Sequence, residues 1–152
     1  MSDQPEPLHP SYNRVKDNTY VMPCKVVVKL SDPRVGLGVF AIDNIEKGEV
    51  IERCPALQLI WRSHYIGDPL INKYVWQDPC TCDVCKEHGH HLYLLLGCGS
   101  LYNHRDEPNA ECDISFPKLV ADIRALKDIE AGEEICIHYG SHYFGKRRKL
   151  NI

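Results

Sequence analysis

An amide and an imidazole stand side by side at Asn103-His104, directly after an apolar run, and a second amide follows in Pro108-Asn109. Asn and His side chains both donate and accept hydrogen bonds, so grouped around a bend they can hold a polar ligand. The simpler interpretation is a loop that these side chains tie to their own backbone. The segment is a candidate ligand site.

A pair of glycines, Gly36-Leu37-Gly38, precedes the apolar residues Val39-Phe40-Ala41. Glycines let a backbone pass close to a ligand and offer it free N–H and C=O groups. The segment lacks the third glycine and the following helix of a dinucleotide site, so we do not expect a phosphate cradle. A hairpin turn that opens a strand is the alternative interpretation.

A phenol closes the apolar run in residues 133–140. Alternation along a strand places Ile135, Ile137 and Tyr139 on one face. A tyrosine at the end of a buried strand is usually a core residue with one hydrogen bond, and it can equally form the polar tip of an aromatic channel.

In this order and separation, the three segments resemble the motifs of the SET-domain protein lysine methyltransferases. Residues 36–41 resemble the first motif of that family. Asn103-His104 with Pro108-Asn109 resembles its Asn-His-x-x-x-Pro-Asn signature, and residues 132–140 resemble its terminal Gly-Glu-Glu-(Leu/Ile)-x-x-x-Tyr-Gly. The resemblance extends from Val26 to Phe144, and it is to the minimal single-domain members seen in bacteria and viruses. It implies a mainly β fold, the SET-domain (β-clip) fold of several small sheets with little helix and a C-terminal pseudoknot.

The resemblance also implies an enzyme that transfers a methyl group from S-adenosyl-L-methionine to a lysine side chain of a protein, with histones among the candidate substrates. Tyr139 would be the catalytic residue, and Tyr143 would line the substrate channel. The cofactor would be bound by Gly36, Leu37, Gly38, Asn103, His104 and Phe144.

This reaction requires no carboxylate base. Neutralising a lysine amine with a pKa of ~10.4 costs about 4 kcal/mol at pH ~7.5. A positive charge ~4 Å away, at an effective dielectric constant of ~20, supplies about 4 kcal/mol of repulsion, and the sulfonium of the cofactor is such a charge. A tyrosine hydroxyl is a poor base at neutral pH, so Tyr139 is expected to orient the amine and the methyl group.

The sequence departs from the family pattern in two places. Arg105 follows Asn103-His104, where the family more often has Ser, which leaves the local hydrogen bonding open. Cys136 is the last cysteine, so the zinc-binding cysteines that follow the tyrosine motif in many histone-directed members have no counterpart here. Tyr143-Phe144 and the basic tail are the candidates to close the site instead.

A cluster of soft metal ligands, Cys80-x-Cys82-x-x-Cys85-x-x-His88, lies before the Asn-His motif. Three thiolates and an imidazole form a ligand set for a structural zinc ion. The spacing is shorter than in standard zinc fingers, and a loop with free thiols is the alternative. Cys98 or Cys112 could supply the fourth ligand instead of His88.

Two other functions stay open. The first is a catalytically silent SET-like module that binds a basic peptide or the cofactor, although the presence of Tyr139 favours turnover. The second is a thiol hydrolase with Cys98 as nucleophile and His104 or His138 as base, which requires a thiol and an imidazole in hydrogen-bond reach.

Short strands must position these residues. We expect strands at residues 25–30, 39–42, 50–61, 119–123 and 134–139, and a polar loop at residues 78–91. The segment Ile45–Ile51 recurs in similar form at Ile129–Ile135, each with a Gly in a turn that leads into a strand. Chance recurrence and a structural repeat both fit this pattern.

The chain length and composition set the frame for these motifs. With 152 residues, 43% apolar and 26% charged, the chain suits one domain and excludes wholesale disorder. We expect a Pro-rich arm at residues 1–23, a SET domain at residues 24–145 with a Cys/His-rich insert at residues 78–91, and a basic tail at residues 146–152.

Charge and targeting signals indicate the partners and the compartment. The net charge of −3 becomes −7 when the four bases Lys146, Arg147, Arg148 and Lys149 are left out, which favours a basic lysine-containing protein or peptide over nucleic acid as partner. No apolar run reaches the length of a membrane span, and the first residues do not form a signal peptide. We therefore expect an intracellular protein, cytoplasmic or nuclear, that is neither secreted nor bound to a membrane.

Overall fold

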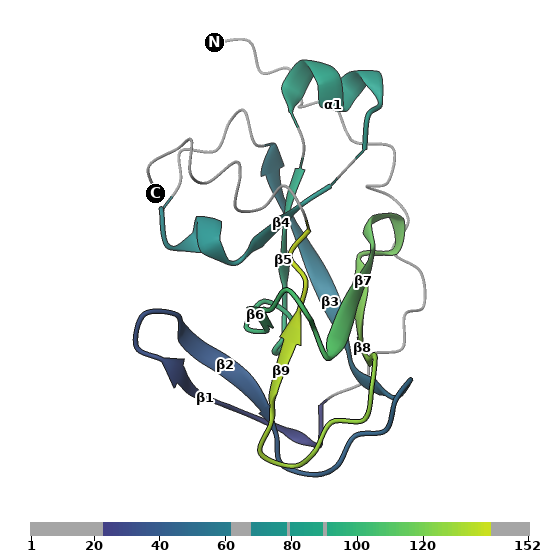
Figure 1. Cartoon of the computed structure of the whole chain (residues 1–152). Coiled ribbons are helices and arrows are strands. Elements are labelled where there is room, and N and C mark those ends of the chain that lie inside the picture. Colours follow the sequence, from purple (N-terminus) through teal and green to yellow (C-terminus); the bar gives the residue numbers. More distant parts are fainter. Residues whose placement is uncertain (1–22, 62–67, 79, 90, 141–152) are drawn as a thin grey trace.

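The fold consists of two curled β-sheets, as Figure 1 shows, in a computed structural model that describes residues 23–61, 68–78, 80–89 and 91–140. The strands are β1 (Val26–Asp32), β2 (Gly36–Ala41), β3 (Val50–Trp61), β4 (Val75–Gln77), β5 (His91–Leu95), β6 (Asn103–His104), β7 (Ala110–Ser115), β8 (Val120–Ala125) and β9 (Glu134–Ile137). The helices are short, namely α1 (Asp83–His88) and the 3-10 helices η2 (Ile71–Lys73) and η3 (Phe116–Lys118). The prediction of a mainly β fold with several small sheets and little helix is confirmed.

The first sheet brings the glycine segment, the Asn-His pair and the last strand together. Its order is β1-β2-β9-β6, with β9 antiparallel to β2 and parallel to β6. Val39 of β2 is paired with Ile135 of β9, and His104 of β6 is paired with Ile137 of β9. Segments that are separated by about a hundred residues in sequence therefore lie on adjacent strands.

The second sheet packs behind the first and has the order β4-β5-β3-β8-β7, with every neighbouring pair antiparallel. The long strand β3 pairs with β8 along its first half and with β5 along its second half. The inner faces of the two sheets bury Val39, Ile123, Ile135 and Ile137 completely. Each such side chain contributes about 2 kcal/mol of transfer free energy, so this cluster holds β2, β8 and β9 in register.

The recurrence of the Ile45–Ile51 pattern at residues 129–135 is a structural repeat. Ile45 and Ile129 form an antiparallel bridge through two reciprocal backbone hydrogen bonds of 2.9 Å. In each turn the Glu before the strand caps the turn, because Glu49 Oε2 accepts the N–H of Glu46 and Glu133 Oε2 accepts the N–H of Glu130. The two turns thus have the same geometry and brace each other beneath β3 and β9.

The Cys/His-rich segment differs from the loop that we expected, since it contains the helix α1. The helix has six residues and projects from the end of the second sheet between β4 and β5 (Figure 1). Within the described part of the chain, no helix combines the length and the apolar character needed to cross a membrane.

Candidate active site

The Asn103 side chain joins the glycine segment to the last strand. Its Nδ2 atom donates to the backbone carbonyl of Leu37 (3.1 Å) and to Oε1 of Glu134 (2.8 Å). Both partners are oxygens, which fixes the orientation of the amide and turns its Oδ1 atom away from them. The other carboxylate oxygen of Glu134 accepts a hydrogen bond from the Ser31 hydroxyl (2.9 Å). Two sequence-predicted cofactor residues, Leu37 and Asn103, are therefore in direct contact.

Gly38 is the residue that makes this contact sterically feasible. A Cβ atom at this position would collide with the Glu134 carboxylate and the Asn103 amide. Gly36 plays a different part, because its φ of 97° lies in the region that favours glycine and a Cβ atom there would meet no atom within 4 Å. The first glycine forms the turn and borders open space, and the second lets the Asn103 amide approach the strand.

The start of β2 presents an open backbone edge beside these residues. The pairing of β2 with β9 covers Val39 and Phe40, whereas Gly36, Leu37 and Gly38 pair with β1 on their other edge. Within the described residues, β9 does not pair with the first three residues of β2. At Leu37 the backbone of this edge meets the Asn103 side chain in place of a strand, so a ligand bound here would lie beside that amide.

His104 is held as one tautomer by its two neighbours. The backbone N–H of Tyr139 donates to Nδ1 of His104 (3.2 Å), so this nitrogen carries no proton. The proton of the neutral ring is then on Nε2, which donates to Oδ1 of the exposed Asp106 (3.0 Å). The ring centroids of His104 and Tyr139 are 5.4 Å apart. His104 therefore positions the backbone of Tyr139.

Tyr139 follows β9 and is half-buried, and its hydroxyl lies 2.7 Å from the backbone carbonyl of Tyr102. A carbonyl only accepts, so the single hydroxyl proton of Tyr139 points at Tyr102, and the oxygen can take part in any other hydrogen bond only as the acceptor. The ring of Trp76 on β4 meets the Tyr139 ring edge-on, with centroids 6.0 Å apart. The phenol is thereby fixed at both its ring and its hydroxyl.

A buried carboxyl group, that of Glu52, is hydrogen-bonded to the side chain of Tyr102. Glu52 of β3 is 2% exposed, and its two oxygens accept the Tyr102 hydroxyl (3.1 Å) and the backbone N–H of Cys98 (2.9 Å). Burial raises the pKa of Glu52, while these two hydrogen bonds oppose that shift. Burial also raises the pKa of Tyr102, which keeps its hydroxyl protonated as a donor. Tyr102 thus links the second sheet to the site, because its side chain binds Glu52 while its backbone carbonyl binds the Tyr139 hydroxyl.

Asn109 fastens the last strand behind the site. This amide is 1% exposed, donates to the backbone carbonyl of Glu134 (2.9 Å) and accepts the backbone N–H of Cys136 (2.7 Å). The Pro108-Asn109 part of the signature therefore has a structural task. It holds β9 between β2 and β6.

The hydrolase alternative finds no support in the surroundings of Cys98. Burial and the nearby Glu52 carboxylate raise the pKa of the Cys98 thiol, whereas a nucleophilic cysteine requires a lowered one. Both ring nitrogens of His104, the base considered first, are engaged with Tyr139 and Asp106.

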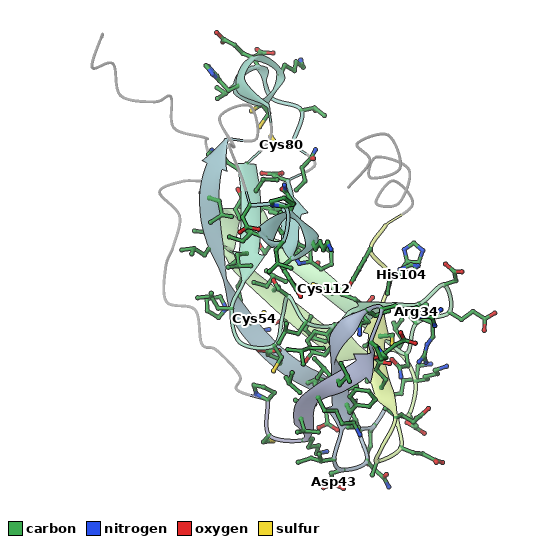
Figure 2. All side chains as sticks on the ribbon, turned by 90° about the vertical axis from the view of Figure 1, so that its left-hand side faces the viewer. Arg34, Asp43, Cys54, Cys80, His104 and Cys112 are labelled. Carbon is green, nitrogen blue, oxygen red and sulfur yellow. The ribbon has the colours of Figure 1, made fainter. Side chains whose placement is uncertain are left out.

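The cysteine cluster lies away from the site just described. The thiol groups of Cys80, Cys82 and Cys85 lie within 4.8 Å of one another, and His88 is not a member of this group. Figure 2 shows Cys80 near the α1 end of the molecule and His104 beside the first sheet, at a different level. Cys98 and Cys112 do not belong to the group either.

Some predicted residues lie outside the described residues, namely Tyr143, Phe144 and the basic tail at residues 146–152. Conversely, three residues beside the site were not foreseen, which are Glu52, Trp76 and Tyr102. Glu52 is a charged residue within an apolar run, and that signal could have singled it out. Trp76 and Tyr102 carry no local signal, because only the pairing of the strands brings them to Tyr139.

A family model described as "SET domain" matches residues 36–140. The chain is 31% identical over 106 residues to mouse protein-lysine N-trimethyltransferase SMYD5, and the match covers 69% of this chain and 25% of that protein. It is 30% identical over 113 residues to a Schizosaccharomyces pombe histone-lysine N-methyltransferase specific for H3 lysine-37, covering 72% of this chain and 69% of that protein. The chain thus spans about a quarter of the first relative and about two thirds of the second.

A solved structure has the same fold. It is a Plasmodium falciparum protein provisionally described as a histone methyltransferase, with a TM-score of 0.60 and 29% sequence identity. The match covers 82% of this chain and 99% of that one.

Proposed function

The chain belongs to the SET domain family, and we propose that it is a protein-lysine N-methyltransferase that uses S-adenosylmethionine. One observation carries the proposal. The Tyr139 hydroxyl donates its proton to the Tyr102 carbonyl, so that its oxygen can only accept further hydrogen bonds, and the Tyr139 ring lies beside that of His104, with the centroids 5.4 Å apart. An acceptor oxygen without a proton to give is suited to orient an amine or a methyl group, and it is unsuited to act as a general acid.

The residues at the start of β2 fit the proposed cofactor. S-adenosylmethionine carries a positively charged ammonium group and a positively charged sulfonium group. Nearby carbonyl and carboxylate oxygens stabilise both charges. The Leu37 carbonyl and the Glu134 carboxylate, which both accept hydrogen bonds from the Asn103 amide, bring oxygen atoms together beside the open backbone edge. We propose that Gly36, Leu37, Gly38, Asn103 and His104 hold the cofactor, together with Phe144, which lies outside the described residues. When bound, the cofactor would supply the methyl group and a fixed positive charge that lowers the pKa of a lysine.

The phenol and its neighbours would receive the substrate amine. The edge-on ring of Trp76 and the half-buried ring of Tyr139 give this side of the site an apolar, aromatic lining, which favours a neutral amine over an ammonium ion. The Tyr139 oxygen can accept an N–H of the amine and hold its lone pair in line for attack. Tyr143 is proposed to complete the channel, so that the role of this chain is orientation and exclusion of water.

The proposed substrate is a basic protein segment that contains a lysine. The names of the two relatives describe enzymes that act on protein or histone lysines, and the acidic body of the chain suits a basic partner. We propose histones as the first substrates to examine, and the cytoplasm or nucleus as the compartment. Direct binding of nucleic acid is not part of the proposal.

The test is a methyl-transfer assay with isotopically labelled S-adenosylmethionine, the full chain, a panel of histones and cell lysates, read by mass spectrometry. The proposal predicts label on the ε-amine of one or a few lysines. Tight binding of the cofactor or of a basic peptide without any transferred label would instead identify a silent binding module. A chain that binds neither the cofactor nor any substrate would contradict both.

A further inference from the structure

The three thiols at the start of α1 form a cluster that the proposed methyl transfer does not use. The Sγ atoms of Cys80, Cys82 and Cys85 lie within 4.8 Å of one another, and none of these cysteines is in a disulfide. Three thiolates at such distances would repel one another strongly, so they either stay protonated or share a cation. The cluster is therefore either a group of protonated thiols or a metal-binding site.

The backbone around Cys82 directs hydrogen-bond donors at the Cys82 sulfur. These donors are the N–H groups of Cys85 and Val84, and the side chains of Cys80 and Cys85 also contact this sulfur. On the other side, the backbone N–H of Cys80 donates to the buried carboxylate of Asp78 (2.8 Å), which fixes the entry into the turn. Metal ligands are commonly oriented by hydrogen bonds from neighbouring groups, and these N–H groups are placed to orient Cys82 in this way.

The helix itself has little else to hold it in place. It contains six residues, which is far below the length at which an isolated helix is stable, and its single buried residue is Cys85. In other words, the one side chain of α1 that is withdrawn from water is a potential metal ligand. The described residues of α1 include no other buried side chain that could hold the helix in place. A metal ion bound by Cys80, Cys82 and Cys85 would stabilise this segment instead.

We propose that Cys80, Cys82 and Cys85 bind one Zn²⁺ ion that fixes α1 between β4 and β5. Soft thiolates select zinc over the hard cations Ca²⁺ and Mg²⁺, and three of them fill three positions of its tetrahedron. The fourth ligand lies outside this group. His88 stands one helical turn after Cys85 on the same face of α1 and is the candidate from the sequence. The role of the ion is structural and not catalytic, because the cluster lies near α1, away from the site around His104 and Tyr139.

The test measures metal content in the full chain, purified from zinc-containing medium under reducing conditions without chelator. The proposal predicts about one zinc per chain in the wild type. Substitution Cys82→Ser should abolish the bound zinc, and Cys80→Ser should do the same. Both cysteines are partly exposed, so their loss creates no buried cavity. The matched control is Cys24→Ser, because Cys24 is an exposed cysteine outside the cluster, and this variant should keep wild-type zinc.

A second readout distinguishes a specific site from adventitious metal. Replacement of zinc by Co²⁺ should give the ultraviolet sulfur-to-cobalt charge-transfer band and the visible bands of a tetrahedral thiolate site, in the wild type and in Cys24→Ser. Both sets of bands should be lost in Cys82→Ser, with the far-ultraviolet circular dichroism of the β-sheets unchanged. A reduced wild type free of zinc and without cobalt bands would overturn the proposal, as would a Cys82→Ser variant that binds metal like the wild type.

Discussion

The hydroxyl of Tyr139 donates its proton to the backbone carbonyl of Tyr102 over 2.7 Å, and the side chain of Tyr102 donates in turn to the buried Glu52. One residue thus supports the phenol with its main chain while its own hydroxyl is fixed to the second sheet. Tyr102 directly precedes β6 of the first sheet, and its side chain is bound to β3 of the second, so the position of the Tyr139 oxygen is set by the packing of the two sheets.

The Glu52 carboxyl group should make stability depend on pH. Its raised pKa means that the folded state binds the proton more tightly than the unfolded state does, for which the ordinary value is 4.5. The stabilising contribution is therefore complete below the unfolded pKa and is lost as the pH rises through the folded pKa. In Glu52→Gln this loss is absent, so the variant should gain stability relative to the wild type as the pH rises above 4.5.

Urea unfolding of both proteins at several pH values measures this difference. The control is Glu111→Gln, which makes the same substitution at an exposed carboxylate on β7. A stability difference between Glu52→Gln and wild type that is the same at every pH would refute the assignment.

Gly38→Ala should weaken cofactor binding. The added Cβ atom would collide with the Glu134 carboxylate and the Asn103 amide, so these groups must move away from the Leu37 carbonyl. We expect at least a tenfold rise in the dissociation constant of S-adenosylmethionine, which corresponds to about 1.4 kcal/mol. Isothermal titration calorimetry measures it directly.

The matched control for that variant is Gly48→Ala. Gly48 has a φ of 86° with open space around its Cβ position, so this substitution strains a turn without touching the site. It should lower the stability by about 1 kcal/mol and keep the affinity for the cofactor. Equal affinities for Gly38→Ala and wild type would show that the β2 edge does not bind the cofactor.

Asn109→Ala should destabilise the whole domain. It leaves the Cys136 N–H and the Glu134 carbonyl without their buried side-chain partner, and each such loss costs about 1–3 kcal/mol. The result is a drop of a few kcal/mol in the free energy of unfolding, measured with urea. The comparison is with Asn44→Ala, an exposed amide whose Oδ1 accepts the Ala131 N–H, where the drop should be below about 1 kcal/mol. Similar values for both variants would contradict the role of Asn109 as the fastener of β9.

Some of the strands could be predicted from the sequence and others could not. The strands at β1, β2, β3, β8 and β9 follow from short runs of apolar and β-branched residues between turn residues, because such runs fit a half-buried, pleated surface. By contrast, β4 has three residues, too few to show an alternation, and its place is set by pairing with β5. In β7 the alternating residues Ala110, Cys112 and Ile114 are mostly small, which weakens the apolar pattern.

The residues that were not foreseen share a physical reason. Trp76 and Tyr102 approach Tyr139 from the second sheet and from the segment before β6, so their role depends on tertiary packing alone. The helix α1 was expected as a loop, since its sequence is polar and its single buried side chain is a cysteine. Its stability depends on the surroundings of that cysteine, which no periodicity encodes.

The most direct measurement of the central claim is methyl transfer by Tyr139→Phe, with cofactor affinity determined on the same preparation. The variant keeps the aromatic ring against Trp76 and removes only the oxygen that is held by Tyr102. We predict an unchanged dissociation constant for S-adenosylmethionine and a fall of at least about a hundredfold in the rate of lysine methylation, the scale of loss expected when reacting atoms are misaligned. A variant that methylates its substrate as fast as the wild type would contradict the claim that this hydroxyl orients the reacting groups.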